Sequence, residues 1–153
     1  GLTNSHVRLA TPGALKSSAT LRGVEAFVGI DLFSRAWSAE GAVRSYTSEP
    51  FSNTQLTLKE FDIKVVYRQE MGRPFYWRAG AGVAARYLDF SNRPPELEKK
   101  TYTTPASLLV VGVGAQMSPS FSAGLDINYK NALINDTIDR SAIDGNIRLT
   151  GSF

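Results

Sequence analysis

Residues 75–90, FYWRAGAGVAARYLDF, alternate between apolar and polar positions with a period of two. The odd positions are apolar with an aromatic ring at each end: Phe75, Trp77, Ala79, Ala81, Val83, Ala85 and Tyr87. The even positions carry arginines and glycines: Tyr76, Arg78, Gly80, Gly82, Ala84 and Arg86. Successive side chains of a strand point to opposite faces, so this segment is predicted to be a long β-strand. An apolar face with aromatics at both ends, opposite a polar face, is typical of a barrel wall that meets lipid outside.

The same alternation recurs along the chain and predicts eight strands. They are residues 2–10, 20–33, 37–48, 54–69, 75–90, 105–117, 121–131 and 142–153. Long connections (11–19, 49–53, 91–104 and 132–141) alternate with short turns near Ser34, Glu70 and Ser118. Bacterial outer-membrane barrels have an even number of strands, short periplasmic turns and longer outer loops. We therefore predict an all-β fold, a closed eight-stranded antiparallel up-and-down transmembrane β-barrel with no edge left to face lipid.

Parity also predicts the register between the second and third strands. Inward positions are odd on residues 20–33 and even on residues 37–48, so paired residue numbers must sum to an odd value. A two-residue turn at residues 34 and 35 places Glu25 opposite Arg44, whereas a four-residue turn would place Glu25 opposite Tyr46. The tight turn is favoured because it pairs opposite charges across the strands.

The outward aromatic residues gather at the two ends of the predicted strands. Five lie at the short-turn ends and two at the loop ends: Trp37, Phe75, Trp77, Phe121 and Phe153, then Tyr87 and Tyr129. Rings of aromatic residues at both interfaces are a feature of membrane barrels. These residues are therefore predicted to form two aromatic girdles.

The inward face of the predicted barrel carries charges of both signs. The predicted lumen ion network consists of Glu25, Arg44, Glu40, Glu60, Lys64, Arg68, Arg78, Arg86, Asp126 and Arg148. An eight-stranded barrel is only wide enough for side chains to fill it, and buried charges must be paired. The nearly balanced signs favour an ion-paired plug over a polar conduit. Gly80 and Gly82 are predicted to make room for large lumen side chains such as Tyr76, Arg78 or Arg86.

The composition argues against several functions but does not indicate a particular one. The chain is 42% hydrophobic and 20% charged, with a net charge of +3 and no cysteine. The small net charge with interspersed signs disfavours nucleic-acid binding. His6 is the single histidine and lies in a segment without a catalytic motif, so no catalytic residue, metal site or cofactor is predicted. Asp139 is placed in the loop of residues 132–141.

The C-terminal segment, INDTIDRSAIDGNIRLTGSF, carries a family resemblance. With its alternation and strand count, the chain resembles the small eight-stranded bacterial outer-membrane β-barrels, the group of the OmpA membrane domain, OmpX and NspA. In that family the last strand ends in Phe after alternating apolar residues, and the barrel assembly machinery reads this signal. The resemblance places the signal at Phe153, Leu149 and Ile147, although Gly145 and Gly151 depart from the pattern. It implies a multi-pass protein of a Gram-negative outer membrane, in contact with membrane lipid and lipopolysaccharide.

The function expected from this sequence is a structural anchor or a surface interaction and adhesion protein, not an enzyme. The long loop from Ser91 to Thr104 is the candidate site for a protein partner, because barrel function usually lies in outer loops. Two alternatives stay open: a membrane-embedded lipid-modifying enzyme, and a soluble lipocalin-like carrier of a small ligand with its faces inverted. Residues 1–153 are predicted to be a single barrel domain. An interpretation as the C-terminal membrane domain of a longer protein stays open beside it.

Overall fold

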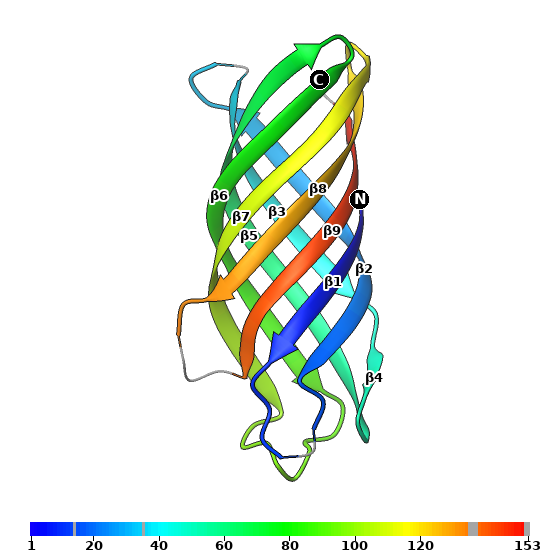
Figure 1. Ribbon diagram of the computed structural model, residues 1–153, viewed down its shortest axis with the longest axis vertical. Helices are drawn as coiled ribbons and strands as arrows, with labels where there is room; N and C mark the ends of the chain where they lie inside the picture. Colours follow the sequence, from blue (N-terminus) through cyan, green and yellow to red (C-terminus); the bar gives the residue numbers. More distant parts are fainter. Residues whose placement is uncertain (14, 35, 135–137, 152–153) are drawn as a thin grey trace.

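The chain folds into a ring of antiparallel strands, shown as a computed structural model in Figure 1. The structure describes residues 1–13, 15–34, 36–134 and 138–151. Its strands are β1 (Leu2–Leu9), β2 (Ser18–Asp31), β3 (Trp37–Tyr46), β4 (Glu49–Phe51), β5 (Thr54–Gly72), β6 (Phe75–Phe90), β7 (Thr101–Ser118), β8 (Phe121–Ala132) and β9 (Asp139–Gly151). Within the described ranges, no helix is long and apolar enough to cross a membrane.

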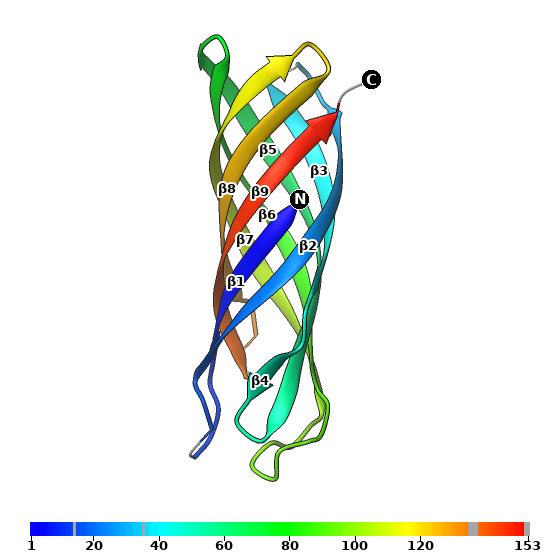
Figure 2. The ribbon, with the colours of Figure 1, turned by 90° about the vertical axis from the view of Figure 1, so that its right-hand side faces the viewer.

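Eight of the strands close into the ring. Its order is β1, β2, β3, β5, β6, β7, β8 and β9, and β9 pairs back onto β1. Every pairing is antiparallel, so the predicted closed eight-stranded architecture is confirmed. β4 stands outside the ring and forms a short hairpin with the start of β5 (Figure 2). The prediction that residues 49–53 form only a loop is therefore wrong.

The long connections lie at one end of the barrel and the short turns at the other (Figure 1). We call these the loop end and the short-turn end. Toward the loop end the wall is longer than predicted, because β7 begins at Thr101 and β9 begins at Asp139. Residues 101–104 and 139–141, predicted to be loop, are therefore part of the wall.

The predicted register between β2 and β3 is confirmed. Glu25 lies directly opposite Arg44, within a ladder that runs to Asp31 and Ser38. At the turn, the Trp37 amide donates a hydrogen bond to the Ser34 carbonyl at 3.0 Å. Arg35 of the predicted two-residue turn lies outside the described residues. The confirmed register brings the carboxylate of Glu25 and the guanidinium of Arg44 to the same level inside the barrel.

The outer wall carries a continuous belt of exposed aliphatic side chains, which we call the outer apolar band. Its members are Val24, Val28, Ile30, Val43, Ile63, Val65, Val83, Leu109, Val111, Val113, Leu125, Ile127, Ile143, Ile147 and Leu149. Val28 is 71% exposed and Leu149 is 60% exposed, far more than side chains of a protein core. A belt of this size is not a surface that a monomeric protein normally shows to water.

The interior changes character along the barrel axis. Next to the outer apolar band the inward side chains are charged, but at the loop end they are apolar. This loop-end core consists of Val7, Leu9, Leu21, Tyr46, Phe51, Leu56, Leu58, Leu88, Phe90, Leu97, Tyr102 and Ala142. The outward side chains at that level are polar, such as Lys59, Thr103 and Asn131. The loop end therefore has the polarity of a water-soluble barrel, and the rest of the wall has the opposite polarity.

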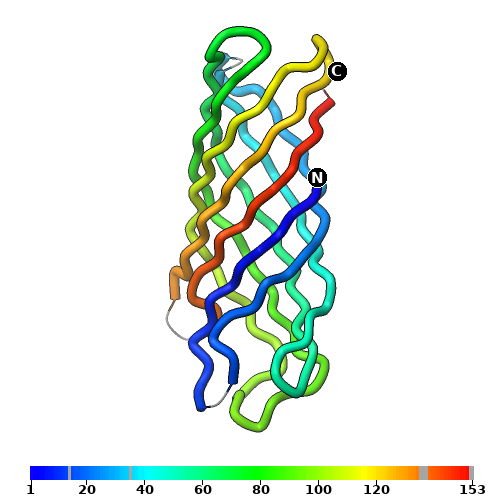
Figure 3. Tube along the Cα trace, turned by 45° about the vertical axis from the view of Figure 1, so that its right-hand side comes forward, coloured from blue at the N-terminus to red at the C-terminus, as the bar shows by residue number. Residues whose placement is uncertain are grey.

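β1 lines the ring only toward the loop end, as the trace in Figure 3 shows. Gly1 and Glu25 exchange two backbone hydrogen bonds, of 2.7 and 2.9 Å. Past Glu25 and Ile147, β2 and β9 continue toward the short-turn end without a described strand paired between them. There the guanidinium of Arg148 lies over the ring of Phe27, 3.7 Å from its centroid. Backbone pairing closes the ring near the loop end, and this side-chain contact joins β2 and β9 farther along.

The lumen glycines have a different role from the predicted one. A Cβ on Gly80 would lie 2.9 Å from the Val66 Cα, and one on Gly82 would lie 2.6 Å from the Lys64 Cα. These glycines therefore allow β5 and β6 to approach closely, rather than making room for Arg78 or Arg86. Space for the Tyr76 ring comes instead from Gly114, whose added Cβ would collide with the Tyr76 hydroxyl.

Substituting Gly82 by alanine is expected to destabilise the barrel by about 1–3 kcal/mol, because the new methyl group meets backbone that cannot move away. Gly145→Ala is the matched control, since a Cβ at Gly145 meets nothing within 4 Å. The control is expected to be neutral or slightly stabilising, because alanine loses less backbone entropy on folding. Urea unfolding of both variants in detergent micelles measures the difference, and equal stabilities would contradict the close approach of β5 and β6.

Candidate functional site

The most distinctive feature of the interior is a set of ion pairs, which we call the lumen ion network. In the described part of the chain it joins seven carboxylates to six cations. The members are Glu25, Glu40, Glu60, Asp62, Asp126, Asp139 and Asp144 with Arg44, Lys64, Arg78, Arg86, Lys130 and Arg148. Nearly all of these side chains are buried, so each charge depends on the others for stabilisation.

Glu60 is the centre of the network toward the loop end. Its carboxylate accepts a hydrogen bond from Arg86 Nε at 2.7 Å and one from the Lys130 ammonium. The Tyr46 hydroxyl also donates to it at 3.2 Å. Lys130 contacts Asp144 as well, so Glu60 connects β5 with β6, β8 and, through Lys130, β9. One carboxylate thus links strands around much of the ring.

The middle of the network is organised by Arg44. Its guanidinium pairs with Glu25 at 2.5 Å and also contacts Asp62. Asp62 in turn accepts a hydrogen bond from Lys64 at 2.9 Å. Because the inward residues of β2, β3 and β5 are in register here, opposite charges lie side by side across three neighbouring strands.

Toward the short-turn end, two carboxylates alternate with two arginines. Glu40 pairs with Arg78 at 2.7 Å and with Arg148 at 3.0 Å. Asp126 pairs with Arg148 at 2.9 Å and with Arg78 at 3.4 Å. The four side chains come from β3, β6, β8 and β9, so this cluster bridges opposite sides of the lumen.

Five residues differ from the predicted lumen ion network, and three of them, Asp62, Lys130 and Asp144, are additional members. Arg68 was placed in the ion network, but its guanidinium donates to Gln116 at 2.9 Å and lies over the ring of Tyr76. Asp139 was placed in a loop, but it is buried in the lumen and accepts a hydrogen bond from Arg86 at 2.6 Å. The cause is a bulge at the loop end: Arg8 pairs with Ser141 while Leu9 pairs with Asp139, which reverses the inward parity of β9 at this point.

The aromatic residues assigned to the girdles, as far as they are described, lie near the strand ends on the outer wall, and their role at the membrane interfaces stays a prediction. At the short-turn end, Tyr67 packs between Trp37 and Trp77, with ring centroids 5.0 and 5.7 Å away. The exposed rings of the predicted girdles are Trp37, Phe75, Phe121, Tyr87 and Tyr129. Phe153 lies outside the described residues, and Leu149 and Ile147 are exposed on the outer wall of β9. The role of these three as an assembly signal stays a prediction.

The longest loop closes the loop end of the barrel. Of the predicted segment, residues 91–100 form the loop, and they fold back onto the wall. Leu97 is buried in the loop-end core, and Arg93 donates to the carbonyls of Leu97 and Glu98 at 3.3 Å. The Lys99 amide donates to the Tyr102 hydroxyl at 3.2 Å. These contacts fasten the loop to the wall and leave its other charged side chains exposed.

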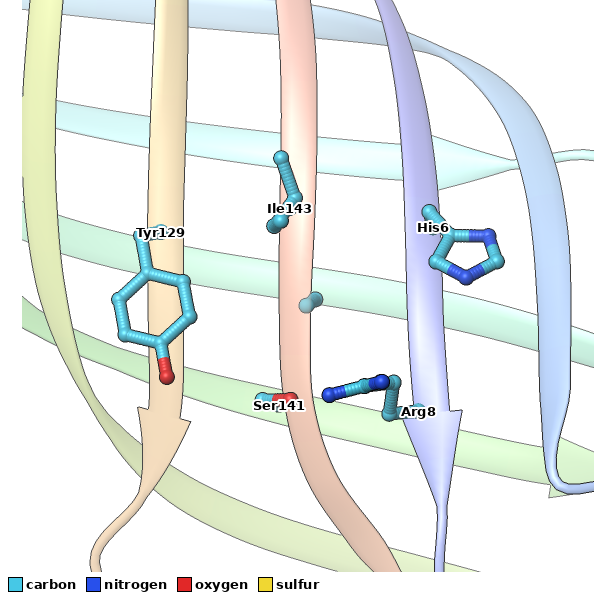
Figure 4. Close-up of a pocket in the computed structure, with 6 residues that line it drawn as sticks. His6, Arg8, Tyr129, Ser141 and Ile143 are labelled. Carbon is cyan, nitrogen blue, oxygen red and sulfur yellow. The ribbon is translucent and has the colours of Figure 1, made fainter.

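The described part of the outer wall contains hollows, of which two lie on the same face. One of about 360 Å³ is lined by His6, Arg8, Tyr129, Ser141, Ala142 and Ile143 (Figure 4). The other, of about 330 Å³, is apolar and is lined by Phe75, Val113, Gly114, Ala123, Gly124, Leu125 and Ile147. Both lie on the face formed by β8 and β9 with their neighbours. In the lumen, by contrast, the ion network occupies the space between the strands.

His6 faces outward in the first of these hollows. Its Nδ1 atom shares a hydrogen bond of 3.0 Å with the Thr20 hydroxyl. Among the described contacts, none joins His6 to Ser141 or to a carboxylate, so these residues are not arranged as a nucleophile with its base. The described residues also contain no cluster of three or more His, Asp or Glu side chains that would hold a metal ion.

Comparison with known proteins places the fold. No protein-family model matches the chain, and no curated protein matches its sequence. The crystal structure of Neisserial surface protein A (NspA) is similar, with a TM-score of 0.78 and 12% identity over 99% of this chain and 94% of that one. Ail, the attachment invasion locus protein of Yersinia pestis, in complex with the heparin analogue sucrose octasulfate, gives a TM-score of 0.64 and 12% identity over 99% and 95% of the chains. The chain has the fold of the small eight-stranded outer-membrane β-barrels.

Proposed function

We propose that the protein is an integral β-barrel of a Gram-negative outer membrane that presents a rigid, closed loop end as a surface for adhesion. In this proposal the outer apolar band sits in the hydrocarbon, and the loop end stands in water outside the cell. The short turns face the periplasm. The ion-paired lumen makes the barrel a solid anchor rather than a conduit for solutes.

The observation that carries this proposal is the reversal of polarity along the barrel axis. Apolar side chains are outside and charged side chains inside over most of the wall, and the arrangement is inverted at the loop end. A wall that passes from hydrocarbon into water needs this change, because each outer face must match its own solvent. A soluble lipocalin-like barrel would have the loop-end arrangement over its whole length. The outer apolar band therefore favours the membrane protein over the soluble carrier.

The filled lumen supports an anchor without an open pore. The network joins β2, β3, β5, β6, β8 and β9 across the lumen, and Leu97 is buried in the loop-end core. Opening a path would require breaking buried ion pairs, each of which leaves an uncompensated charge. Among the residues that the structure describes, no specific contact favours a lipid-modifying enzyme.

The loop end supports a partner of negative charge. Its exposed described cations are Arg8, Lys16, Arg22, Lys59, Arg93, Lys99, Lys100 and Arg140, whereas its exposed described carboxylates are Glu96 and Glu98. A surface rich in one sign of charge attracts partners of the opposite sign. Ail, which shares the fold, has been crystallised with a heparin analogue. We therefore propose a sulfated or otherwise polyanionic surface as the partner of the loop end.

The double variant K99E/K100E is expected to bind heparin at least about tenfold more weakly than the unchanged protein, because two charged contacts become repulsive. Retention of the detergent-refolded barrel on a heparin column, measured as the salt concentration at elution, checks this. Glu96→Lys should shift elution to higher salt. Arg73→Glu is the matched control, since Arg73 is exposed at the opposite end of the barrel. Equal losses in the control and the double variant would show attraction to net charge alone and would refute a loop-end site.

A further inference from the structure

The hollow around Arg8 lies at the edge of the outer apolar band. Tyr129 and Ile143 are the last apolar side chains of β8 and β9 on the outer wall, and Arg8 and Ser141 lie one position closer to the loop end. Figure 4 shows the Arg8 side chain reaching across toward Ser141 on β9, with the Tyr129 hydroxyl pointing toward the same level. The hollow therefore has an apolar side and a polar side.

The charge of this hollow is positive. Arg8 is exposed, and it forms no ion pair with any carboxylate of the described residues. The bulge on β9 adds Arg140 as an extra, exposed residue beside Ser141. His6 uses Nδ1 for its contact with Thr20, which leaves Nε2 for another partner. A guanidinium beside hydroxyl and imidazole groups is a suitable arrangement for binding a phosphate.

Beside the exposed side chain of Ile127, Gly145 leaves a low stretch of wall between the polar hollow and the apolar one, which we call the furrow. On β8 and β9, Tyr129 pairs with Ile143, the next outward pair is Ile127 and Gly145, and the pair after that is Leu125 and Ile147. Gly145 has nothing within 4 Å of the position of a Cβ, so the wall is low between the two hollows. From Ile143 to Ile147 the strand advances about 13 Å. A path of this length, cationic at one end and apolar along the rest, has the form of a lipid with an anionic head group.

We propose that the β8–β9–β1 face binds one phosphorylated lipid of the outer leaflet. Arg8 binds the phosphate together with His6 and Ser141, and an acyl chain lies along Gly145 into the hollow beside Leu125. This inference rests on the proposed location in an outer membrane and adds a specific lipid site to it. The phosphates of a leaflet lie at the level where the aromatic and apolar residues of a membrane protein end, which is the level of Arg8 here.

The test is native mass spectrometry of the detergent-refolded protein with short-chain phosphatidic acid. Saturable binding is expected, and Arg8→Gln should weaken it about tenfold or more, because the charged hydrogen bonds to phosphate are lost. Lys59→Gln is the matched control: Lys59 is an exposed outward cation on β5, separated from β1 by β2 and β3. It should leave the affinity unchanged. Gly145→Leu should fill the furrow and also weaken binding, although it leaves every cation in place.

Four outcomes would overturn the site. Equal affinities of the unchanged protein and Arg8→Gln would show that Arg8 does not contact the lipid. Equal losses of affinity in Arg8→Gln and Lys59→Gln would show that binding depends on the net charge of the protein and not on this site. If inorganic phosphate bound as tightly as phosphatidic acid, the acyl chain would not contribute to binding. If a diacylglycerol of equal chain length bound as tightly, the phosphate would not contribute. Heat-dependent gel mobility of each sample is recorded in parallel. A folded barrel without lipid binding refutes only this site, whereas a protein that folds and stays dissolved without detergent refutes the membrane proposal as well.

Discussion

Replacing Glu60 by alanine is expected to lower the free energy of unfolding by about 3–5 kcal/mol, because two buried cations each lose one of their carboxylate partners. Glu60 is fully enclosed in the lumen and receives hydrogen bonds from Arg86 and Lys130. Its removal leaves Lys130 with Asp144 and Arg86 with Asp139, so each cation keeps one carboxylate and loses another. Urea titration in lipid vesicles, followed by tryptophan fluorescence, measures the change.

Two variants make the Glu60 experiment decisive. Glu60→Gln keeps the shape and one acceptor oxygen, so it should cost less than alanine but more than a surface change. Glu96→Ala removes an exposed carboxylate from the loop and should change the stability by no more than about 0.5 kcal/mol. If Glu60→Ala and Glu96→Ala were equally harmless, the lumen would contain enough water to solvate the cations, and the ion-paired plug would be wrong.

A lysine at the centre of the outer apolar band is expected to destabilise the protein in lipid by about 2–4 kcal/mol. Leu125 is the suitable position, because it is the middle outward residue of β8 between Phe121 and Tyr129. In the proposed orientation its side chain lies near the centre of the hydrocarbon, where an ammonium group loses its hydration. Folding of Leu125→Lys into vesicles is measured by urea titration and by the mobility of unboiled protein on a gel.

Asn131→Lys is the matched control for this change. Asn131 is also an exposed outward residue of β8, but it lies at the loop end beyond the outer apolar band. A lysine there should cost about 0–1 kcal/mol, as at an interface. A soluble barrel would tolerate both lysines equally on its water-facing wall, so equal stabilities of the two variants would contradict the membrane location.

The strands could be predicted from the sequence because alternation and parity report directly on which face a side chain occupies. Parity restricted the register, and the choice of the tight turn that pairs opposite charges brought Glu25 opposite Arg44. It also placed Glu60 and Arg86 on the inner face, where the structure joins them. The assignment of side chains to the inner or outer face needs only the geometry of a strand, which is the same in lipid and in water.

The extent of the wall could not be predicted, because the polarity of the two faces is exchanged at the loop end. Tyr102 and Thr104 point inward, and Thr101 and Thr103 point outward. At the loop end an apolar residue therefore no longer indicates the outer face, as it does beside lipid. Leu58 and Leu88 are likewise inward and buried. Inward and outward residues continue to alternate through this change. The outward residues become polar there, so a strand recognised by its apolar outer face is predicted to end too early.

Asp139 was missed for a different reason. The bulge at Arg140 inserts one residue, and every parity-based assignment on β9 before that point is then reversed. Asp139, Arg140 and Ser141 are residue types that are common in loops, so no signal in the sequence shows that a strand with a bulge begins there. The contact with Arg86 shows which side the carboxylate takes, and that depends on a strand far away in the sequence.

The pairing of β1 with β9 has a consequence for how the barrel reaches its closed state. All other pairings within the ring join strands that follow one another closely in the chain, whereas this one joins its two ends. Closing a flexible loop of nearly the whole chain costs about 4 kcal/mol in entropy. The ladder between β1 and β9 has eight residue pairs, and each hydrogen bond is worth only about 1 kcal/mol in water. Pairing of β1 with β9 is thus only modestly favourable in water. In hydrocarbon each unpaired backbone group costs several kcal/mol, so the barrel is expected to close as it enters the membrane.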